Sequence, residues 1–259
     1  MVVTAAQIKE LREITGVGMM ECKDALVATD GDMEKAMEEL RKKGLSKAAK
    51  KADRETSEGC IKIEINGDKC YVVSLTCETD FLAKSDGFQG LLSELMGMLK
   101  AGKTTEEMEQ TKKESVLKLG ENMVLKVAKV ISGAKIESYV HSNGKLASVV
   151  VSKKADTDGE KLKQVAMHVT ATNPDYLATS DISAEAVEKE KSIQMEIMKN
   201  DPKMAGKPEQ VLENILAGKL NKFKEDITLL EQAFVVNPDL KVKQFIGEDT
   251  LEAFYRFSI

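Results

Sequence analysis

Apolar residues recur at helical spacing along the first 44 residues, and this pattern predicts three short helices. The first begins with Thr4 and Gln7, a capping-box pair in which each side chain satisfies a backbone donor of the other residue. The second is expected over about Met19–Ala28, and Gly44 is expected to end the third. The apolar residues expected to pack together are Ile8, Leu11, Ile14, Met20, Leu26, Val27, Met33, Met37 and Leu40. The segment predicts a minimal three-helix domain.

A basic segment follows these helices. Residues 41–54 contain seven Lys or Arg and one Asp, a local net charge of +6 in a chain whose formal net charge is −5. The Ala and Lys content of residues 45–54 favours a helix, but the segment has no apolar face with which to pack. We interpret residues 45–54 as a solvated linker, with a helical extension as the alternative.

From residue 56 onward the period of the apolar residues changes from helical to alternating. Ile61, Ile63 and Ile65 alternate with charged residues, residues 66–69 (Asn-Gly-Asp-Lys) are typical of a tight turn, and an apolar run returns over 71–75. This predicts a β-hairpin. A loop is expected over residues 77–88 and a helix over about 88–101, and residues 104–131 are predicted to be helical again.

The same order of elements recurs about 75 residues later. Residues 136–140 and 146–151 predict two strands joined by a turn at 142–145, and a helix is expected over about 159–172. The shared pattern of strand, turn, strand, loop and helix indicates two related α+β halves with antiparallel sheets.

Residues 183–224 interrupt the sheet pattern with two amphipathic helices, expected over about 183–199 and 209–224. The segment between them is rich in helix-breaking residues, which predicts an antiparallel helical hairpin that projects from the second half. An alternating strand is expected to follow over 253–259. The fold class is therefore α+β, and the predicted domains are the three-helix domain with its basic linker (1–54), the first core subdomain (55–135), the second core subdomain (136–182 with 225–259) and the hairpin (183–224).

Composition narrows the class of protein. No apolar run approaches the roughly 18–20 residues that cross a bilayer, and the first residues lack the basic and apolar regions of a secretory signal. The four cysteines, at positions 22, 60, 70 and 77, form no CxxC pair and do not have the spacing of a zinc site. We expect a cytoplasmic protein with reduced thiols, no metal site and no cofactor.

Catalytic signals are missing from the sequence. It contains no GxSxG, HExxH, P-loop or GxGxxG motif. His141 falls in a predicted turn and His168 on a helix face beside apolar residues, and neither has an acidic or nucleophilic partner close in sequence. We interpret His168 as a hydrogen-bonded core residue and do not expect an enzyme.

The segment Thr79-Asp80-Phe81-Leu82 has no equally simple structural explanation. It follows a predicted strand in a polar loop, and aromatic residues make up only 4% of the chain, with no Trp. Phe81 could staple the loop to the core, or it could anchor the chain in a partner protein, because interfaces concentrate binding energy in a few aromatic residues. The neighbouring Asp80 carboxylate could compete for a metal ion in that partner.

Three stretches resemble the elongation factor Ts family. They are Leu11–Leu26 (LREITGVGMMECKDAL), Thr79–Lys84 followed by Gly87 and Phe88, and Met167–Ala171 followed by Pro174. Gly120–Asn122 and Tyr139–His141 add to the match, so the resemblance covers nearly the whole chain. It implies a ubiquitin-associated-like domain at the N-terminus, a core of two related subdomains and a projecting helical hairpin.

The resemblance also implies a function and a set of site residues. Members of the family are guanine-nucleotide exchange factors that bind the GDP form of elongation factor Tu and promote the release of GDP. GTP can then bind during translation elongation. The matching segment Thr79, Asp80, Phe81 and Leu82 is expected to dislodge magnesium in the partner, with Phe81 wedged between two helices of its GTPase domain. The other partner contacts that the resemblance implies are Lys9, Arg12, Met19, Met20 and Lys23 at the N-terminal docking face, and Leu119, Gly120 and His141 in the core.

Further expectations concern the assembly. The hairpin at 183–224 is expected to touch the partner away from the nucleotide, and the complex is expected to be a one-to-one heterodimer. Many relatives continue into a C-terminal helix that adds a contact with the partner, whereas this sequence stops at Ile259, so lower affinity is expected. Membrane and direct nucleic-acid partners are not expected.

Two other functions are left open by the residues alone. The basic segment 41–54 could make the chain an RNA-associated adaptor, which predicts RNA affinity that falls steeply with salt. The three-helix domain could instead be a ubiquitin-type binding module on an α+β enzyme, in which case changing His141 or Cys77 would abolish turnover.

Overall fold

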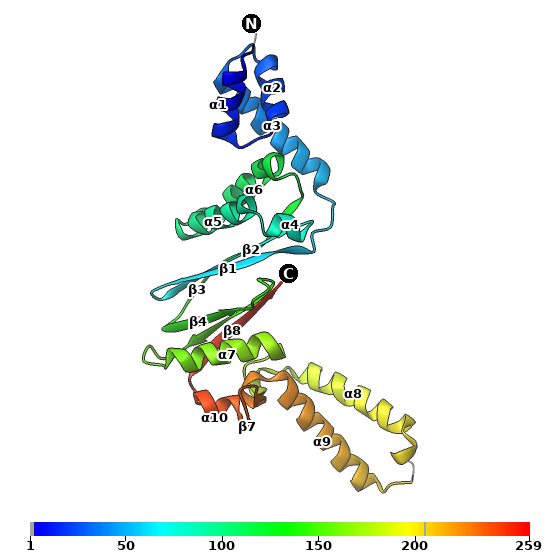
Figure 1. Ribbon diagram of the computed structural model, residues 1–259. Coiled ribbons are helices and arrows are strands. Elements are labelled where there is room, and N and C mark those ends of the chain that lie inside the picture. The colour runs from blue at the N-terminus through cyan, green and yellow to red at the C-terminus, as the bar shows by residue number, and fades with distance from the viewer. Residues whose placement is uncertain (1–2, 205) are drawn as a thin grey trace. The chain divides into compact units, whose positions relative to one another are not determined.

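The computed structural model describes residues 3–204 and 206–259, and the chain folds into two compact units (Figure 1). The first unit consists of Met1–Ile131, Val140–Leu146 and Phe257–Ile259, and the second of Ser132–Tyr139 and Ala147–Arg256. Both units combine helices with small sheets, so the predicted α+β class is confirmed. The boundaries of the four predicted domains stay predictions.

The three N-terminal helices are confirmed. They are α1 (Ala5–Thr15), α2 (Met19–Ala28) and α3 (Met33–Lys51). The capping box of Thr4 and Gln7 is present at the start of α1. The expected burial is wrong at three positions, because Ile14, Met20 and Val27 are exposed. The buried side chains of this small core are Leu11, Val17, Cys22, Ala25, Leu26, Ala36, Leu40 and Leu117.

Helix α3 does not end at Gly44, as the sequence predicts, but continues to Lys51. Gly44 faces helix α6 (Thr105–Leu119) so closely that a Cβ atom built on it would lie 3.1 Å from the backbone oxygen of Glu114. Ala48, one turn later, is also buried. The packing face of α3 therefore consists of small residues, which carry little hydrophobic signal in a sequence, and the linker interpretation is wrong.

The basic residues of α3 are largely used within the chain. Five of the seven Lys and Arg side chains between residues 41 and 54 contact a carboxylate or a backbone oxygen of the same unit. Two of these contacts lie at the end of the helix, where Lys51 donates to the backbone oxygen of Gly120 and Arg54 pairs with Glu78. The basic segment thus fastens the helices to the core, which reduces the charge left for a nucleic acid.

The first sheet begins with the predicted hairpin. Strands β1 (Glu58–Asn66) and β2 (Lys69–Cys77) pair antiparallel, with Glu58 opposite Cys77 and Asn66 opposite Lys69. The third strand, β3 (Met123–Ser132), pairs beside β2. Helix α6 ends at Leu119, because Gly120 adopts a left-handed conformation with φ of 86°. The helix predicted to run to residue 131 is therefore wrong in its second half.

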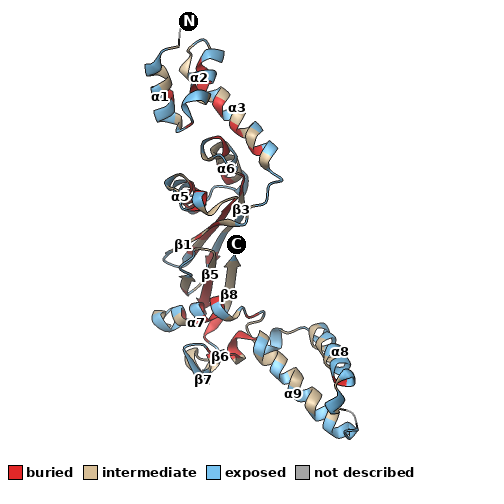
Figure 2. Cartoon of the chain, turned by 45° about the vertical axis from the view of Figure 1, so that its right-hand side comes forward, coloured by how far each residue is buried: buried red, intermediate tan, exposed pale blue. Residues whose placement is uncertain are grey.

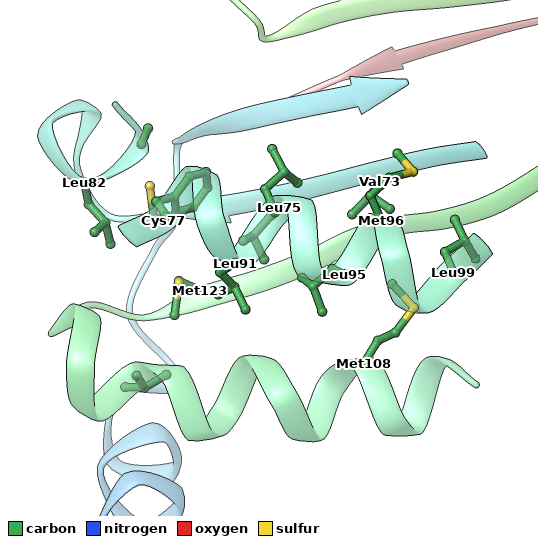
Figure 3. Packing of buried hydrophobic residues seen from close by; sticks show 14 of the residues in the cluster. Val73, Leu75, Cys77, Leu82, Leu91, Leu95, Met96, Leu99, Met108 and Met123 are labelled. Carbon is green, nitrogen blue, oxygen red and sulfur yellow. The ribbon is translucent and has the colours of Figure 1, made fainter. Parts of the chain in front are cut away.

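Helix α5 (Asp86–Lys100) lies between this sheet and α6 (Figure 3). Val73 and Leu75 of β2 pack on one side of α5, and Met108 of α6 packs on the other. The buried side chains of this cluster are Ala48, Val73, Leu75, Cys77, Leu82, Ala83, Phe88, Leu91, Leu92, Leu95, Met96, Leu99, Met108, Val116 and Met123. The cluster extends from Ala48 of α3 to Cys77 at the end of β2, and it also contains Leu82 and Ala83. It therefore anchors the segment that follows β2 in the core of the first unit.

The second unit confirms the predicted repeat of strands and helix. Its sheet has the order β4-β5-β8, with the expected C-terminal strand at the edge, and helix α7 follows β5. A short hairpin and a short helix after residue 232 are additional elements that the pattern does not predict. The elements of this sheet and its surroundings are β4 (Lys135–Val140), β5 (Leu146–Ser152), α7 (Gly159–Thr172), β6 (Ala233–Phe234), β7 (Asn237–Lys241), α10 (Val242–Ile246) and β8 (Leu251–Ser258).

The helical hairpin of the second unit is confirmed as α8 (Ala184–Asn200) and α9 (Glu209–Ile227). The two helices lie side by side, and most of their surface is exposed (Figure 2). Met198 is the buried residue of α8, and α9 has none among its residues. No described helix is long and apolar enough to span a lipid bilayer.

Candidate functional site

The segment Thr79–Leu82 forms the start of a one-turn helix, α4 (Asp80–Ala83), and not the loop that the sequence predicts. Thr79 is its N-cap, with an extended backbone and a hydroxyl that accepts from the amide of Leu82 at 3.2 Å. Ser85 caps α5 in the same way, accepting from the amide of Phe88 at 3.2 Å. Two capping hydroxyls six residues apart therefore turn a polar segment into two consecutive helix starts.

The two apolar residues of α4 face opposite ways. Leu82 is only 8% exposed and packs in the core cluster of the first unit, whereas Phe81 is 84% exposed. Successive residues of a helix point about 100° apart, so a single turn can bury one and present the other. Leu82 is thus the residue that staples the segment to the core, and the alternative in which Phe81 does so is wrong.

The Asp80 carboxylate lies at the first position of α4 beside Phe81. It accepts from Nζ of Lys84 at 2.7 Å; the Lys84 side chain is largely exposed, and that of Asp80 is 46% exposed. This hydrogen bond holds the pKa of Asp80 below its ordinary value. The carboxylate is therefore ionised at neutral pH, and an exposed ion pair of this kind is easily exchanged for contacts with another molecule.

A glutamate that lies just before β3 fixes the N-terminus of α4. Oε2 of Glu121 accepts from the amide of Thr79 at 2.9 Å, and Oε1 accepts from its hydroxyl at 2.6 Å. The sequence singles out Gly120–Asn122 only as part of a family resemblance, without a role for Glu121. No local spacing rule connects residues 79 and 121, because the contact depends on β2 and β3 being neighbours in the sheet.

The core residues that the resemblance assigns to the partner contact, Leu119, Gly120 and His141, all lie in the first unit with α4. Leu119 lines a cavity of about 150 Å³ between the start of α5 and the end of α6, and Gly120 immediately precedes the glutamate that holds Thr79. His141 begins an exposed turn that β1 holds, since the amide of Ile61 donates to the backbone oxygen of Gly144 at 2.8 Å. Strand β1 in turn packs against α4.

The residues expected at the N-terminal docking face are all exposed. Lys9 and Arg12 lie on α1, and Met19, Met20 and Lys23 lie on α2. Ile14 and Val27, which the sequence assigns to the core, are exposed on the same two helices. The surface of α1 and α2 therefore combines apolar and basic side chains, a composition suited to a protein partner.

His168 has the structural role that its sequence context suggests. It is fully buried in α7, where Nε2 lies 2.8 Å from Oε1 of Gln232 and Nδ1 accepts from the amide of Val235 at 3.2 Å. Because Nδ1 is an acceptor, the ring is neutral and Nε2 carries the proton. Burial lowers the pKa of His168, although the hydrogen bond with Gln232 partly opposes the shift.

The cysteines and acidic side chains of the described residues are the remaining candidates for a reactive or metal-binding centre. All four cysteines are free thiols, and burial raises the pKa of Cys77, next to the α4 segment, to about 12. Within residues 3–204 and 206–259, no three His, Cys, Asp or Glu side chains are grouped so as to hold a metal ion. The α4 segment presents an exposed aromatic ring beside an ionised carboxylate.

The α+β fold and this exposed segment can be compared with known protein families. A sequence model of the family described as Elongation factor TS matches residues 78–259, which is most of the chain. The chain therefore belongs to the elongation factor Ts family, whose members are nucleotide exchange factors of translation elongation rather than catalytic enzymes. The matched residues include α4 and the whole of the second unit, whereas α1, α2 and α3 precede the matched residues.

Proposed function

We propose that this chain binds elongation factor Tu and promotes the release of its GDP, after which GTP binds for the next round of elongation. One observation carries the proposal: Phe81 is 84% exposed in a chain that has seven Phe and no Trp. Moving a Phe side chain from water into a pocket contributes about 1.5–3 kcal/mol. An exposed ring on a short, firmly capped helix is therefore well placed to act as an anchor in a partner.

Asp80 and Phe81 have different roles in the proposed mechanism. Phe81 enters between two helices of the partner's GTPase domain, and Asp80 approaches the partner's magnesium ion. Mg²⁺ requires near-ideal octahedral geometry, so a nearby carboxylate or a small shift of its ligands weakens its hold on the phosphates. Leu82 contributes by anchoring α4 in the core, since its side chain has little surface left for a partner.

The remaining contacts are proposed to hold the two proteins together. The docking face on α1 and α2 and the core residues Leu119, Gly120 and His141 add contacts around α4, and the α8–α9 hairpin touches the partner away from the nucleotide. We propose a one-to-one complex in the cytoplasm. The exposure of the docking face, of His141 and of most of the hairpin supports these contacts.

The exchange needs no covalent step, because it follows from coupling between two binding equilibria. If the factor binds nucleotide-free elongation factor Tu more tightly than the GDP form, GDP weakens the binding of the factor by the same ratio. The factor thus speeds release without selecting the nucleotide that returns. An excess of GTP over GDP sets the direction.

Stopped-flow release of a fluorescent GDP analogue from elongation factor Tu tests this function. We expect Phe81→Ala to slow the stimulated release about tenfold or more, since losing about 1.4 kcal/mol of interaction corresponds to a factor of ten. Asp80→Ala is expected to slow it as well, while both variants keep the wild-type circular dichroism spectrum. The matched control is Val235→Ala, which truncates an exposed apolar side chain of the second unit, outside the proposed site, and should leave the release rate unchanged. Unchanged release with Phe81→Ala and Asp80→Ala would defeat the assignment.

A further inference from the structure

We propose that Glu121 is a positioning residue for nucleotide exchange: it holds Thr79 so that α4 begins at Asp80 and presents Phe81 to the partner. This inference rests on the proposed function of Asp80 and Phe81. Glu121 itself lies between α6 and β3, two residues before the strand begins, and it acts through Thr79 rather than by touching the partner.

The geometry around Thr79 is unusually complete for a helix cap. Its hydroxyl accepts from the amide of Leu82 and at the same time donates to Oε1 of Glu121, while its own amide donates to Oε2. A Thr cap on a helix is normally free to orient its hydroxyl among several partners. Here the hydroxyl donates its hydrogen bond to the carboxylate of Glu121, so the lone pairs of the hydroxyl oxygen are directed at the first turn of α4.

The contact belongs to a crossed pair of contacts between the residues just after β2 and the residues just before β3. Glu121 accepts from the amide of Thr79, and Glu78 accepts from the amide of Asn122 at 2.6 Å. The side-chain amide of Asn122 donates in turn to the backbone oxygen of Arg54 at 2.8 Å, just beyond α3. The two strand ends are therefore fixed to each other and to the segment that follows α3.

A one-turn helix depends on such external support. Helices this short are unstable by themselves, because nucleation fixes several backbone angles for one hydrogen bond. In α4, Leu82 and Ala83 fix the inner side, and Glu121 fixes the N-terminus from which Asp80 and Phe81 project. Loss of the Glu121 contact leaves the buried residues in place and frees the end that carries the exposed ring, so the expected effect is on the exchange step rather than on folding.

The test measures stimulated GDP release at increasing concentrations of factor for wild type and Glu121→Gln. We expect the maximal release rate to fall at least threefold, while the factor concentration at half-maximal rate stays within twofold, because the docking contacts remain. Glu107→Gln is the matched control: Glu107 accepts the amide of Thr104 at the N-cap of α6, at 2.8 Å, in the same unit. It should leave the maximal rate unchanged. A wild-type maximal rate for Glu121→Gln would overturn the proposal.

A double-mutant cycle with Phe81→Ala separates this inference from the proposed function. If Glu121 acts by placing Phe81, Glu121→Gln causes no further slowing in the Phe81→Ala background. Equal slowing in both backgrounds overturns the positioning role and leaves the proposed function intact. A wild-type rate for Phe81→Ala alone overturns the proposed function itself.

Thr79→Val provides a second variant should Glu121→Gln unfold at a lower temperature than wild type. It keeps the shape of the side chain and the amide contact with Oε2 of Glu121, but removes the hydroxyl that Oε1 accepts from. We expect a reduced maximal rate with half-saturation unchanged. A wild-type maximal rate for Thr79→Val contradicts the positioning role.

Discussion

Phe81 and Leu82 are neighbours in the chain with opposite environments, and the difference is set by a single turn of helix. A lone exposed apolar residue is ordinary on a protein surface and needs no explanation by itself. The environment of Phe81 is not ordinary, because a capping hydroxyl, the carboxylate of Glu121 and a buried Leu all fix the turn that presents it. The protein thus maintains an exposed ring in a defined place.

His168 gives a residue-scale prediction about pH. Burial lowers its pKa below the ordinary 6.5, so the unfolded chain binds a proton at pH values at which the folded chain does not. The contribution of this residue is fully present above about pH 6.5 and is lost as pH falls below it, by at most about 1.4 kcal/mol per pH unit. Protonation would also remove the acceptor for the amide of Val235.

Urea unfolding at pH 7.5 and pH 5.5 measures this effect. We expect the free energy of unfolding of the wild type to fall between the two pH values by more than that of His168→Gln. His141→Gln, at an exposed turn, should retain the wild-type dependence. The same pH dependence for wild type and His168→Gln would show that the buried ring does not govern this range.

At the scale of elements, the contact between α3 and α6 joins the N-terminal helices to the rest of the first unit. The face of α3 toward α6 includes Gly44 and Ala48, and Leu117 of α6 completes the core of the three helices. Small residues permit the close approach that larger side chains would prevent. The contact therefore depends on volume rather than on hydrophobicity.

Replacing Gly44 by Ala tests this dependence. Ala is favoured over Gly in a helix by about 1 kcal/mol, but the added Cβ would lie 3.1 Å from a backbone oxygen of α6, and overpacking typically costs about 1–3 kcal/mol. We expect Gly44→Ala to lower the free energy of unfolding. Gly97→Ala, at an exposed position of α5 with no heavy atom within 4 Å of the added Cβ, should raise it. Stabilisation by both substitutions in urea unfolding would contradict close packing of α3 on α6.

The elements that the sequence predicts well have local signals. The turn at residues 66–69, the capping box of α1 and the apolar stripe of α7 each depend on residues only a few positions apart. Strand β3 was not predicted, because the apolar residues of 123–132 also fit a helical period and only pairing with β2 decides between the two. The helical extension of α3 was only the alternative interpretation of residues 45–54, because its contact face is formed by Gly and Ala, which give little hydrophobic signal.

The candidate site divides in the same way. Asp80 and Phe81 attract attention in the sequence because an aromatic residue beside a carboxylate is unusual in a polar segment of a chain this poor in aromatics. Glu121 attracts none, because its contact with Thr79 spans 42 positions and exists only in the folded sheet. Sequence patterns thus indicate the residues that face a partner more readily than those that support them.

At the scale of the whole molecule, the proposed contacts fall into two kinds. The face on α1 and α2 is proposed to hold the partner, whereas α4 is proposed to disturb its nucleotide site, and both lie in the first unit. The family match begins at residue 78, so the proposed docking role of α1 and α2 rests on their own exposed residues. The two surfaces should therefore affect exchange in different ways.

The concentration dependence of stimulated GDP release distinguishes these roles. We expect Met20→Ala, which truncates a side chain that is 64% exposed, to raise the factor concentration at half-maximal rate several-fold and leave the maximal rate near wild type. Phe81→Ala is expected to lower the maximal rate. Val27→Ala removes a second exposed apolar residue of α2 for comparison. A lower maximal rate with unchanged half-saturation for Met20→Ala would contradict a docking role.

The central claim is that the ring of Phe81 leaves water and enters elongation factor Tu. Fluorine NMR of the chain with 4-fluorophenylalanine at position 81 observes this ring directly, and the same label at Phe254, packed against the core of the second unit, is the control. On addition of one equivalent of elongation factor Tu with GDP, we predict that the resonance of residue 81 shifts and loses its dependence on H₂O or D₂O, while that of residue 254 does not move. A ring at position 81 that stays in contact with water in the saturated complex would contradict the account.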